Sequence, residues 1–184
     1  MFNPTFTGYW ASFRYLSGVE NDLRKILKPP TPVLPEALNI LKKISDVNTC
    51  FIHYRSYSEE AARDNVRPPL MDYYSQAISK MVKEVPDVKF FVFSDDCDLA
   101  KVQLSNLHNE LNFVDIEEAQ GNQQSLIDFY LMYRCRHAII GNSTFSWWAA
   151  WLNYSEEKIV ICPHGLSPWG DDWTDSDWLK IKVL

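Results

Sequence analysis

Residues 135–153 read CRHAIIGNSTFSWWAAWLN, and this stretch contains the pattern that decides the fold. Residues 137–140 have the apolar composition of a buried strand. Residues 141–143 form a short polar turn, and residues 144–152 are apolar around nearly the whole circumference of a helix, which is typical of a buried helix. A strand that passes through a tight turn into a helix is the repeating unit of a parallel α/β sheet.

The same alternation extends on both sides of this stretch. Short apolar strands that alternate with helices predict a parallel sheet with helices on both faces, so the fold class is α/β and Rossmann-like. Further strands are predicted at residues 49–54, 89–93, 113–115 and 158–162, and further helices at residues 35–44, 70–84, 97–109 and 123–134.

The beginning of the chain differs from the rest. Aromatic residues crowd its start, and residues 18–28 have a short helical pattern that ends at Pro29, because proline lacks the amide that a helix needs. We predict an N-terminal helical and aromatic segment over residues 1–45 and a Rossmann-like domain over residues 46–184. The last part of this domain, residues 163–184, is rich in loop residues.

The composition is that of a globular protein, with 46% hydrophobic and 23% charged residues. Its 18 basic and 24 acidic residues give a net charge of -6, so we expect no general affinity for nucleic acid or anionic membranes. No apolar run approaches the roughly 20 residues of a membrane span, and the N-terminus lacks a signal-peptide pattern. The four scattered cysteines fit reduced, buried thiols. We therefore expect a cytoplasmic protein that can lie at the periphery of a membrane.

Polar side chains that can bind a ligand or take part in catalysis follow the predicted strands. In open α/β sheets, ligands bind beyond the carboxyl ends of the strands, near a switch in strand order. We therefore expect the binding site at this edge, although strands end in polar loops in any protein. The candidates are His53 and Arg55 after the first strand, Asp95 and Asp96 after the second, and Asn142, Ser143 and Thr144 after the fourth.

The candidate residues allow several kinds of chemistry. Ser143 and Thr144 lie at the start of a predicted helix, where free amides favour a phosphate, but a plain capping sequence explains them equally well. Arg55 can hold a pyrophosphate through two parallel hydrogen bonds or be an ordinary surface arginine. Asp95 and Asp96 can bind a metal, act as acid and base, or accept hydrogen bonds from N–H groups such as those of guanine.

Other kinds of site lack their characteristic spacing. The chain has no GxGxxG or GxxxxGK[S/T] phosphate loop and no GxSxG nucleophile elbow. Its four histidines and four cysteines show no zinc-ligand spacing. We therefore expect neither a serine hydrolase nor a zinc site, and the Asp95-Asp96 pair alone is weak evidence for another metal.

The ordered set of motifs resembles that of the bacterial-type α-1,2-fucosyltransferases, glycosyltransferase family 11. The run NSTFSWWAAWLN at residues 142–153 is the most specific match, and the resemblance covers about residues 4–184. The other matching segments are Gly8-Tyr9-Trp10 with Ser12 and Tyr15, His53-Tyr54-Arg55, Phe93-Ser94-Asp95-Asp96, Asp128 with Leu131-Met132, Pro163, and Trp178-Leu179-Lys180-Ile181.

The resemblance implies a two-lobed GT-B enzyme that moves fucose from GDP-fucose to a terminal sugar, often galactose. It also implies inversion at the anomeric centre, with no metal or other cofactor. Members of the family begin with a glycine-rich GGLGNQ segment that has no counterpart here. We therefore expect this chain to be the C-terminal, nucleotide-sugar lobe, which pairs with an N-terminal lobe or self-associates.

The resemblance also implies roles for the candidate residues. Arg55 is expected to hold the pyrophosphate and to stabilise GDP as it leaves, and His53 to orient Arg55 or contact the ligand. The family pattern HxRxGDY is interrupted here, because Arg55 is followed by Ser-Tyr-Ser-Glu. Two alternatives stay open: an inactive lobe that only binds nucleotide or serves as a structural domain, and an unrelated doubly wound enzyme. The remaining donor-site residues are Asn142, Ser143, Thr144 and Phe145 for the phosphate and Asp95 or Asp96 for guanine.

Overall fold

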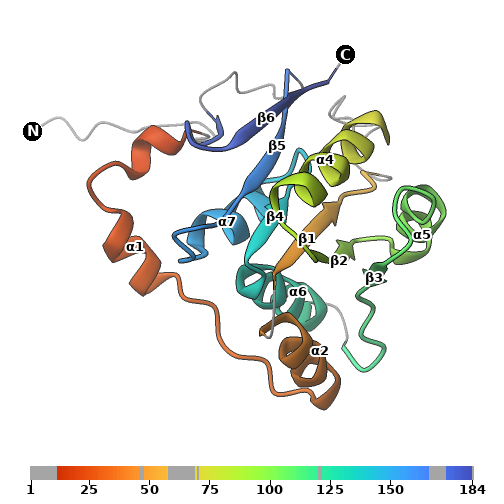
Figure 1. Cartoon of the computed structure of the whole chain (residues 1–184). Coiled ribbons are helices and arrows are strands. Elements are labelled where there is room, and N and C mark those ends of the chain that lie inside the picture. The colour runs from red at the N-terminus through yellow and green to blue at the C-terminus, as the bar shows by residue number, and fades with distance from the viewer. Residues whose placement is uncertain are drawn as a thin grey trace, which may run out of the picture.

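The computed structural model describes residues 12–45, 48–57, 69, 71–119, 122–165 and 173–183. Within these residues six parallel strands form one sheet in the order β3-β2-β1-β4-β5-β6 (Figure 1). This is the strand order of a doubly wound Rossmann fold, with its switch point between β1 and β4. The predicted fold class is confirmed. The strands are β1 (Thr49–Tyr54), β2 (Lys89–Ser94), β3 (Leu111–Phe113), β4 (His137–Ile139), β5 (Val160–His164) and β6 (Leu179–Lys182).

Helices cover both faces of the sheet (Figure 1). On one face, α4 (Met71–Glu84) and α5 (Cys97–Leu104) pack on the strand residues that include Cys50 and Ile52. On the other face, Phe51 contributes to a core shared with α2 (Pro35–Ser45), α6 (Asn122–Arg134) and α7 (Thr144–Leu152). Alternate residues of β1 therefore serve two cores, which explains why the strand is apolar throughout.

The cysteines serve as packing residues. Cys50, Cys135 and Cys162 are buried free thiols, and Cys97 is a half-buried one. Desolvation by burial raises the pKa of Cys162 to about 11, opposed by a hydrogen bond with Thr174 and by the charge of Lys180. Such thiols stay protonated and unreactive at neutral pH, as the sequence predicts.

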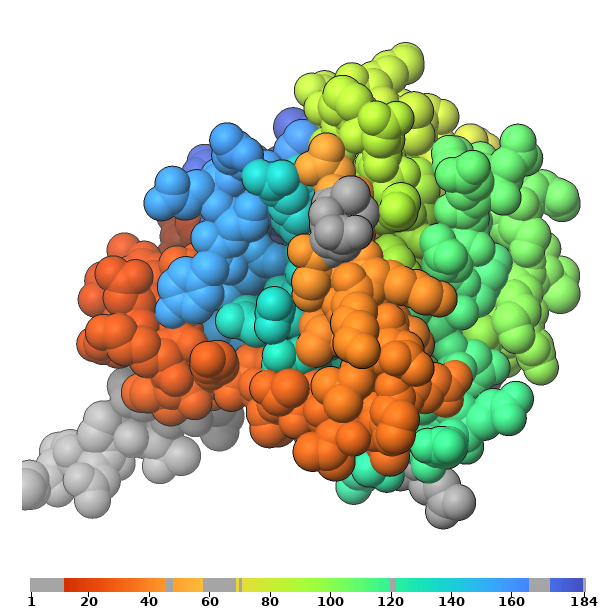
Figure 2. Space-filling model, turned by 60° about the horizontal axis from the view of Figure 1, so that its bottom comes forward, coloured from red at the N-terminus to blue at the C-terminus, as the bar shows by residue number. Residues whose placement is uncertain are grey.

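The first two helices of the N-terminal segment precede α2, and the second of them contacts the domain at α7. They are a 3-10 helix, η1 (Phe13–Leu16), and α1 (Glu20–Ile26), and Figure 2 shows α1 in red beside α7 in blue. The Arg24 guanidinium lies 4.5 Å from the centre of the Trp151 ring and donates a 3.3 Å hydrogen bond to the carbonyl oxygen of Trp151. Lys158 donates a 2.8 Å hydrogen bond to the Ala150 carbonyl oxygen. Two cations thus satisfy the C-terminal end of α7, where carbonyl groups lack helical partners. The division of the chain at residue 45 stays a prediction.

The largest difference from the sequence prediction is β6, which falls in a segment predicted to be loop. Only Ile181 of this strand is buried, and Lys180 and Lys182 are exposed. A four-residue edge strand with outward lysines has too short an apolar pattern to be recognised. Smaller differences concern boundaries: β3 ends at Phe113, before the predicted end of that strand, and α5 ends at Leu104. None of the described helices has the length and apolar character needed to cross a membrane.

Candidate functional site

Arg55 and Asp95 form an ion pair just beyond the ends of two neighbouring strands. Tyr54 and Ser94 are register partners at the ends of β1 and β2. The residues that follow them, Arg55 and Asp95, therefore leave the sheet at the same level. Arg55 Nη1 lies 3.0 Å from Asp95 Oδ2, and the two side chains are 33% and 24% exposed. The strand register therefore holds a guanidinium at the carboxyl edge of the sheet, where a ligand can reach it.

Asp95 also fixes the residue that follows Arg55. Its Oδ1 atom accepts a 2.7 Å hydrogen bond from the backbone N–H of Ser56, and its Oδ2 atom accepts a 2.8 Å bond from Ser56 Oγ. Both carboxylate oxygens are therefore engaged by the segment that follows β1. The sequence predicted the location of Asp95 but not these partners.

Asp96 has a different role in the same turn. It is the N-cap of α5, and its Oδ1 atom accepts a 2.9 Å hydrogen bond from the N–H of Leu99. The hydroxyl of Ser94 accepts a 3.1 Å bond from the Asp96 N–H and donates a 2.9 Å bond to its carbonyl oxygen. One oxygen of Asp96 thus satisfies a helix end, which is a common role for aspartate at this position.

α7 begins in the turn beyond β4, the strand that neighbours β1. Ser143 is its N-cap, and the Ser143 hydroxyl accepts a 3.3 Å hydrogen bond from the N–H of Phe145. Thr144 is the first helical residue and is exposed. The first N–H groups of a helix lack helical partners, and the helix dipole places positive charge there. A helix N-terminus thus lies at the residues that the sequence predicted, and its use as an anion site stays a prediction.

Two buried polar atoms beside this turn have no hydrogen-bond partner among the described residues. They are Asn142 Oδ1 and His53 Nδ1, in residues that are 3% and 4% exposed. Burial lowers the pKa of His53 to about 4; the charge of Asp95 opposes this effect and that of Arg55 adds to it. His53 is therefore neutral at pH 7 and contributes hydrogen-bonding capacity rather than charge. Unpartnered buried polar atoms are rare in folded proteins and require an explanation.

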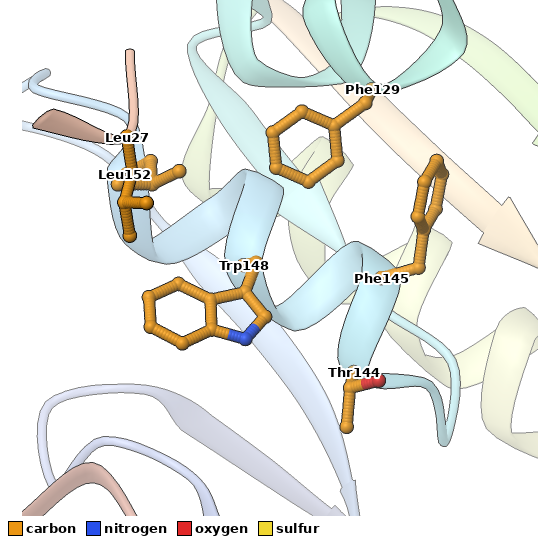
Figure 3. Close-up of a pocket in the computed structure, with 6 residues that line it drawn as sticks. All are labelled: Leu27, Phe129, Thr144, Phe145, Trp148 and Leu152. Atoms are coloured by element: carbon orange, nitrogen blue, oxygen red, sulfur yellow. The ribbon is translucent and has the colours of Figure 1, made fainter. Parts of the chain in front are cut away.

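A pocket of about 510 Å³ adjoins the start of α7 (Figure 3). The Phe145 ring centre lies 5.3 Å from that of Phe129 and 5.7 Å from that of His53, so Phe145 separates the pocket from the buried histidine. The volume is within the range of about 300 to 1,000 Å³ that is usual for small-molecule sites. The lining residues are Leu27, Phe129, Thr144, Phe145, Trp148 and Leu152.

Asp128 is a buried carboxyl group in α6 and does not follow any of the strands at whose ends the sequence predicted a site. Desolvation by burial raises the pKa of Asp128 to about 7; the hydrogen bond from Gln124 opposes this and the charge of Asp115 adds to it. Gln124 Nε2 donates to Asp128 Oδ1 over 2.8 Å. An acidic residue between Ile127 and Leu131, both of which are core positions, is the sequence signal that identifies it.

The described residues contain no group of three or more His, Cys, Asp or Glu side chains that could hold a metal ion. Independence from metal stays a prediction. Residues 8–10, which carry part of the expected family pattern, lie outside the described residues, as do Ser58 and Glu59 beyond Arg55.

Comparison with known proteins finds the family that the motifs resemble. The family described as glycosyl transferase family 11 matches residues 7–173. The chain belongs to glycosyl transferase family 11. An alpha-1,2-colitosyltransferase of Escherichia coli is 30% identical over 194 residues, which cover 96% of this family 11 chain and 62% of that protein. The O-antigen biosynthesis glycosyltransferase WbnK of Escherichia coli is 36% identical over 131 residues, or 68% of this chain and 42% of that protein.

This family 11 chain thus covers between 42% and 62% of the length of these two relatives. Among solved structures, the NodZ alpha-1,6-fucosyltransferase soaked with GDP-fucose aligns with a TM-score of 0.46 and 23% sequence identity. That alignment covers 66% of this chain and 43% of the NodZ chain.

Proposed function

We propose that this family 11 chain binds GDP-fucose and contributes to the transfer of fucose to a hydroxyl group of a terminal galactose in an α-1,2 linkage. The reaction inverts the anomeric centre and needs no metal. The observation that carries the proposal is the Arg55 guanidinium, held by Asp95 at the carboxyl edge of β1, the strand next to β4. The turn that follows β4 leads into the N-terminus of α7, so a guanidinium and a helix N-terminus follow the two strands that flank the switch point.

The proposed chemistry follows from where charge develops. When the bond between fucose and the β-phosphate breaks, negative charge accumulates on the departing GDP. Arg55 and the amides of Ser143 and Thr144 are fixed before the reaction, so they stabilise that charge without reorganising. An arginine and a helix N-terminus together supply the electrostatic stabilisation that a metal ion supplies in other enzymes.

The remaining residues fit supporting roles. His53 is buried and its pKa is lowered to about 4, so it is a weak base and suits a hydrogen-bonding role rather than removal of a proton from the acceptor. Asp96 presents a carboxylate beside the same edge, and one of its oxygens caps α5. Its second oxygen suits the N1–H or amino group of guanine. The acceptor binds on the open side of this edge, where a second lobe or a second copy of the chain completes the cleft.

A second donor sugar has direct support. The Escherichia coli relative that is 30% identical is named for the transfer of colitose in an α-1,2 linkage. Colitose is therefore the alternative to fucose as the transferred sugar, with the same phosphate site and the same stabilisation by Arg55.

A transfer assay tests the proposal. The chain is incubated with GDP-fucose or the colitose-bearing nucleotide and a panel of terminal galactosides in the presence of EDTA, and released GDP and glycosylated product are both measured. We expect transfer in EDTA and its loss in Arg55→Ala. Transfer that requires a divalent metal would contradict the mechanism. Nucleotide binding with no turnover on any acceptor would favour the alternative of a lobe that only binds nucleotide.

A further inference from the structure

We propose that Asp95 is a positioning residue for Arg55 and does not read the nucleobase. This inference rests on the proposed function, because it assigns Asp95 to the same pyrophosphate site. It narrows the expectation, drawn from the resemblance, that Asp95 or Asp96 serves guanine, and leaves Asp96 as the candidate for the base.

The first argument is that both Asp95 oxygens are occupied by the segment that Arg55 belongs to. Oδ1 accepts from the Ser56 backbone N–H, and Oδ2 accepts from Ser56 Oγ and lies 3.0 Å from Arg55 Nη1. When a carboxylate recognises guanine in a bidentate way, it uses both oxygens, one for N1–H and one for the amino group. A base bound to Asp95 in that way would compete with all three of these contacts.

The second argument is geometric. Arg55 and Asp95 are the first residues beyond two register partners, Tyr54 and Ser94, in adjacent parallel strands. Their proximity is therefore set by the sheet itself and does not depend on a flexible loop. Any ligand at the ends of β1 and β2 meets the guanidinium with Asp95 already bound to it.

The third argument is energetic. A free arginine side chain loses much rotational freedom when it is fixed on a ligand, and pre-ordering it removes that cost from binding. Asp95 fixes one end of the guanidinium, and the buried Tyr57 ring lies 5.8 Å from Arg55 Cζ. A carboxylate and an aromatic ring thus define the orientation of Arg55 before the pyrophosphate arrives.

The neighbouring residue Asp96 differs from Asp95 in its contacts. Its side chain accepts a hydrogen bond from Leu99 of α5, so it caps that helix, and among the described residues it makes no ion pair with Arg55. Removal of Asp96 is expected to act on α5, whereas removal of Asp95 is expected to act through Arg55. The two neighbouring aspartates are therefore separable by mutation.

A double-mutant cycle on nucleotide affinity tests the proposal. GDP and ADP affinities are measured by calorimetry for the wild-type chain, Asp95→Ala, Arg55→Ala and the double variant, with Asp95→Asn as the variant that preserves shape. We expect Asp95→Ala to weaken GDP binding about tenfold, and to weaken it no further when Arg55 is already alanine. The ratio of GDP to ADP affinity stays at its wild-type value in Asp95→Ala, and Asp95→Asn falls between Asp95→Ala and wild type.

Controls separate positioning from loss of structure. Asp98→Ala removes a side chain on α5 that is 92% exposed and pairs with Lys101, so it leaves GDP affinity unchanged. Melting temperatures without nucleotide show whether each variant is folded, and Asp95→Asn keeps the cycle interpretable if the alanine variant unfolds. Additive effects of the two alanine substitutions, or a lost preference for GDP over ADP in Asp95→Ala, would overturn the proposal while leaving the proposed function intact. A folded wild-type chain that binds no nucleotide would overturn both.

Discussion

Gly141 and His53 approach so closely that a Cβ atom on Gly141 would lie 3.0 Å from the backbone oxygen of His53. That oxygen also accepts a 3.1 Å hydrogen bond from the hydroxyl of Tyr74, so it cannot move without breaking the bond. The same Cβ atom would lie 3.2 Å from the Tyr74 hydroxyl. Glycine at this position allows the turn before α7 to pack directly against β1 at His53, two residues before Arg55.

Substitution of Gly141 by alanine is expected to impair both folding and binding. The added methyl group forces the turn away from β1, which costs about 1 to 3 kcal/mol of the free energy of unfolding, as overpacking commonly does. It also displaces the N-terminus of α7 from Arg55 and weakens GDP binding. Thermal unfolding and a GDP titration of Gly141→Ala check the two effects, and an unchanged melting temperature would show that this contact does not constrain the turn.

Substitutions of Ser143 and Thr144 are expected to distinguish helix capping from ligand binding. Ser143→Ala removes the N-cap of α7 and lowers the free energy of unfolding by about 1 kcal/mol. Thr144 is exposed, so Thr144→Ala changes stability by no more than about 0.5 kcal/mol. Both variants weaken GDP binding if the phosphate lies at this helix end. Normal GDP affinity in both, with the expected loss of stability in Ser143→Ala, would show that GNST is only a capping sequence.

Asp128 is expected to make the protein less stable as the pH rises. Its pKa is about 7 in the folded chain against 3.8 ordinarily, so the folded state holds the proton more tightly between these values. This group's stabilising contribution is complete below pH 3.8 and is lost as the pH rises through about 7. Asp128→Asn cannot ionise, and we expect it to exceed wild type by about 1 to 3 kcal/mol at pH 8 and to match it near pH 4.

Chemical denaturation of both proteins across pH 4 to 8 checks this difference. The lowered pKa of His53 acts in the opposite direction, because its stabilising effect is lost as the pH falls from 6.5 towards 4. His53 is present in both proteins, so its effect cancels in the comparison. Parallel stability curves for Asp128→Asn and wild type would contradict the raised pKa of Asp128.

Local sequence patterns predicted the parts of the fold that depend on local interactions. The helix at residues 144–152 has the predicted bounds, because an apolar run follows a serine that caps it. In contrast, β6 was missed because its stability comes from pairing with β5 at the sheet edge and not from its own composition. Sequence patterns therefore predict the helices and strands whose own residues favour that structure.

The candidate site shows the same limit. The rule that ligands bind at the carboxyl ends of parallel strands brought Arg55, Asp95 and Ser143 to one edge, and the structure places them directly after β1, directly after β2 and in the turn after β4. The contact between Asp95 and Ser56 joins residues 39 positions apart and depends on strand register, which composition does not encode. The neutral state of His53 likewise depends on burial by other elements.

Thermal unfolding with excess GDP in EDTA tests the central claim most directly, with ADP and UDP as matched nucleotides and Arg55→Ala as the matched variant. A ligand at about 100 times its dissociation constant stabilises a protein by ~2.7 kcal/mol, which is a shift of several degrees in a domain of this size. We predict such a shift for the wild-type chain with GDP, a much smaller one with ADP or UDP, and its loss in Arg55→Ala. An equal GDP shift in wild type and Arg55→Ala, or no shift with any nucleotide, would contradict the account.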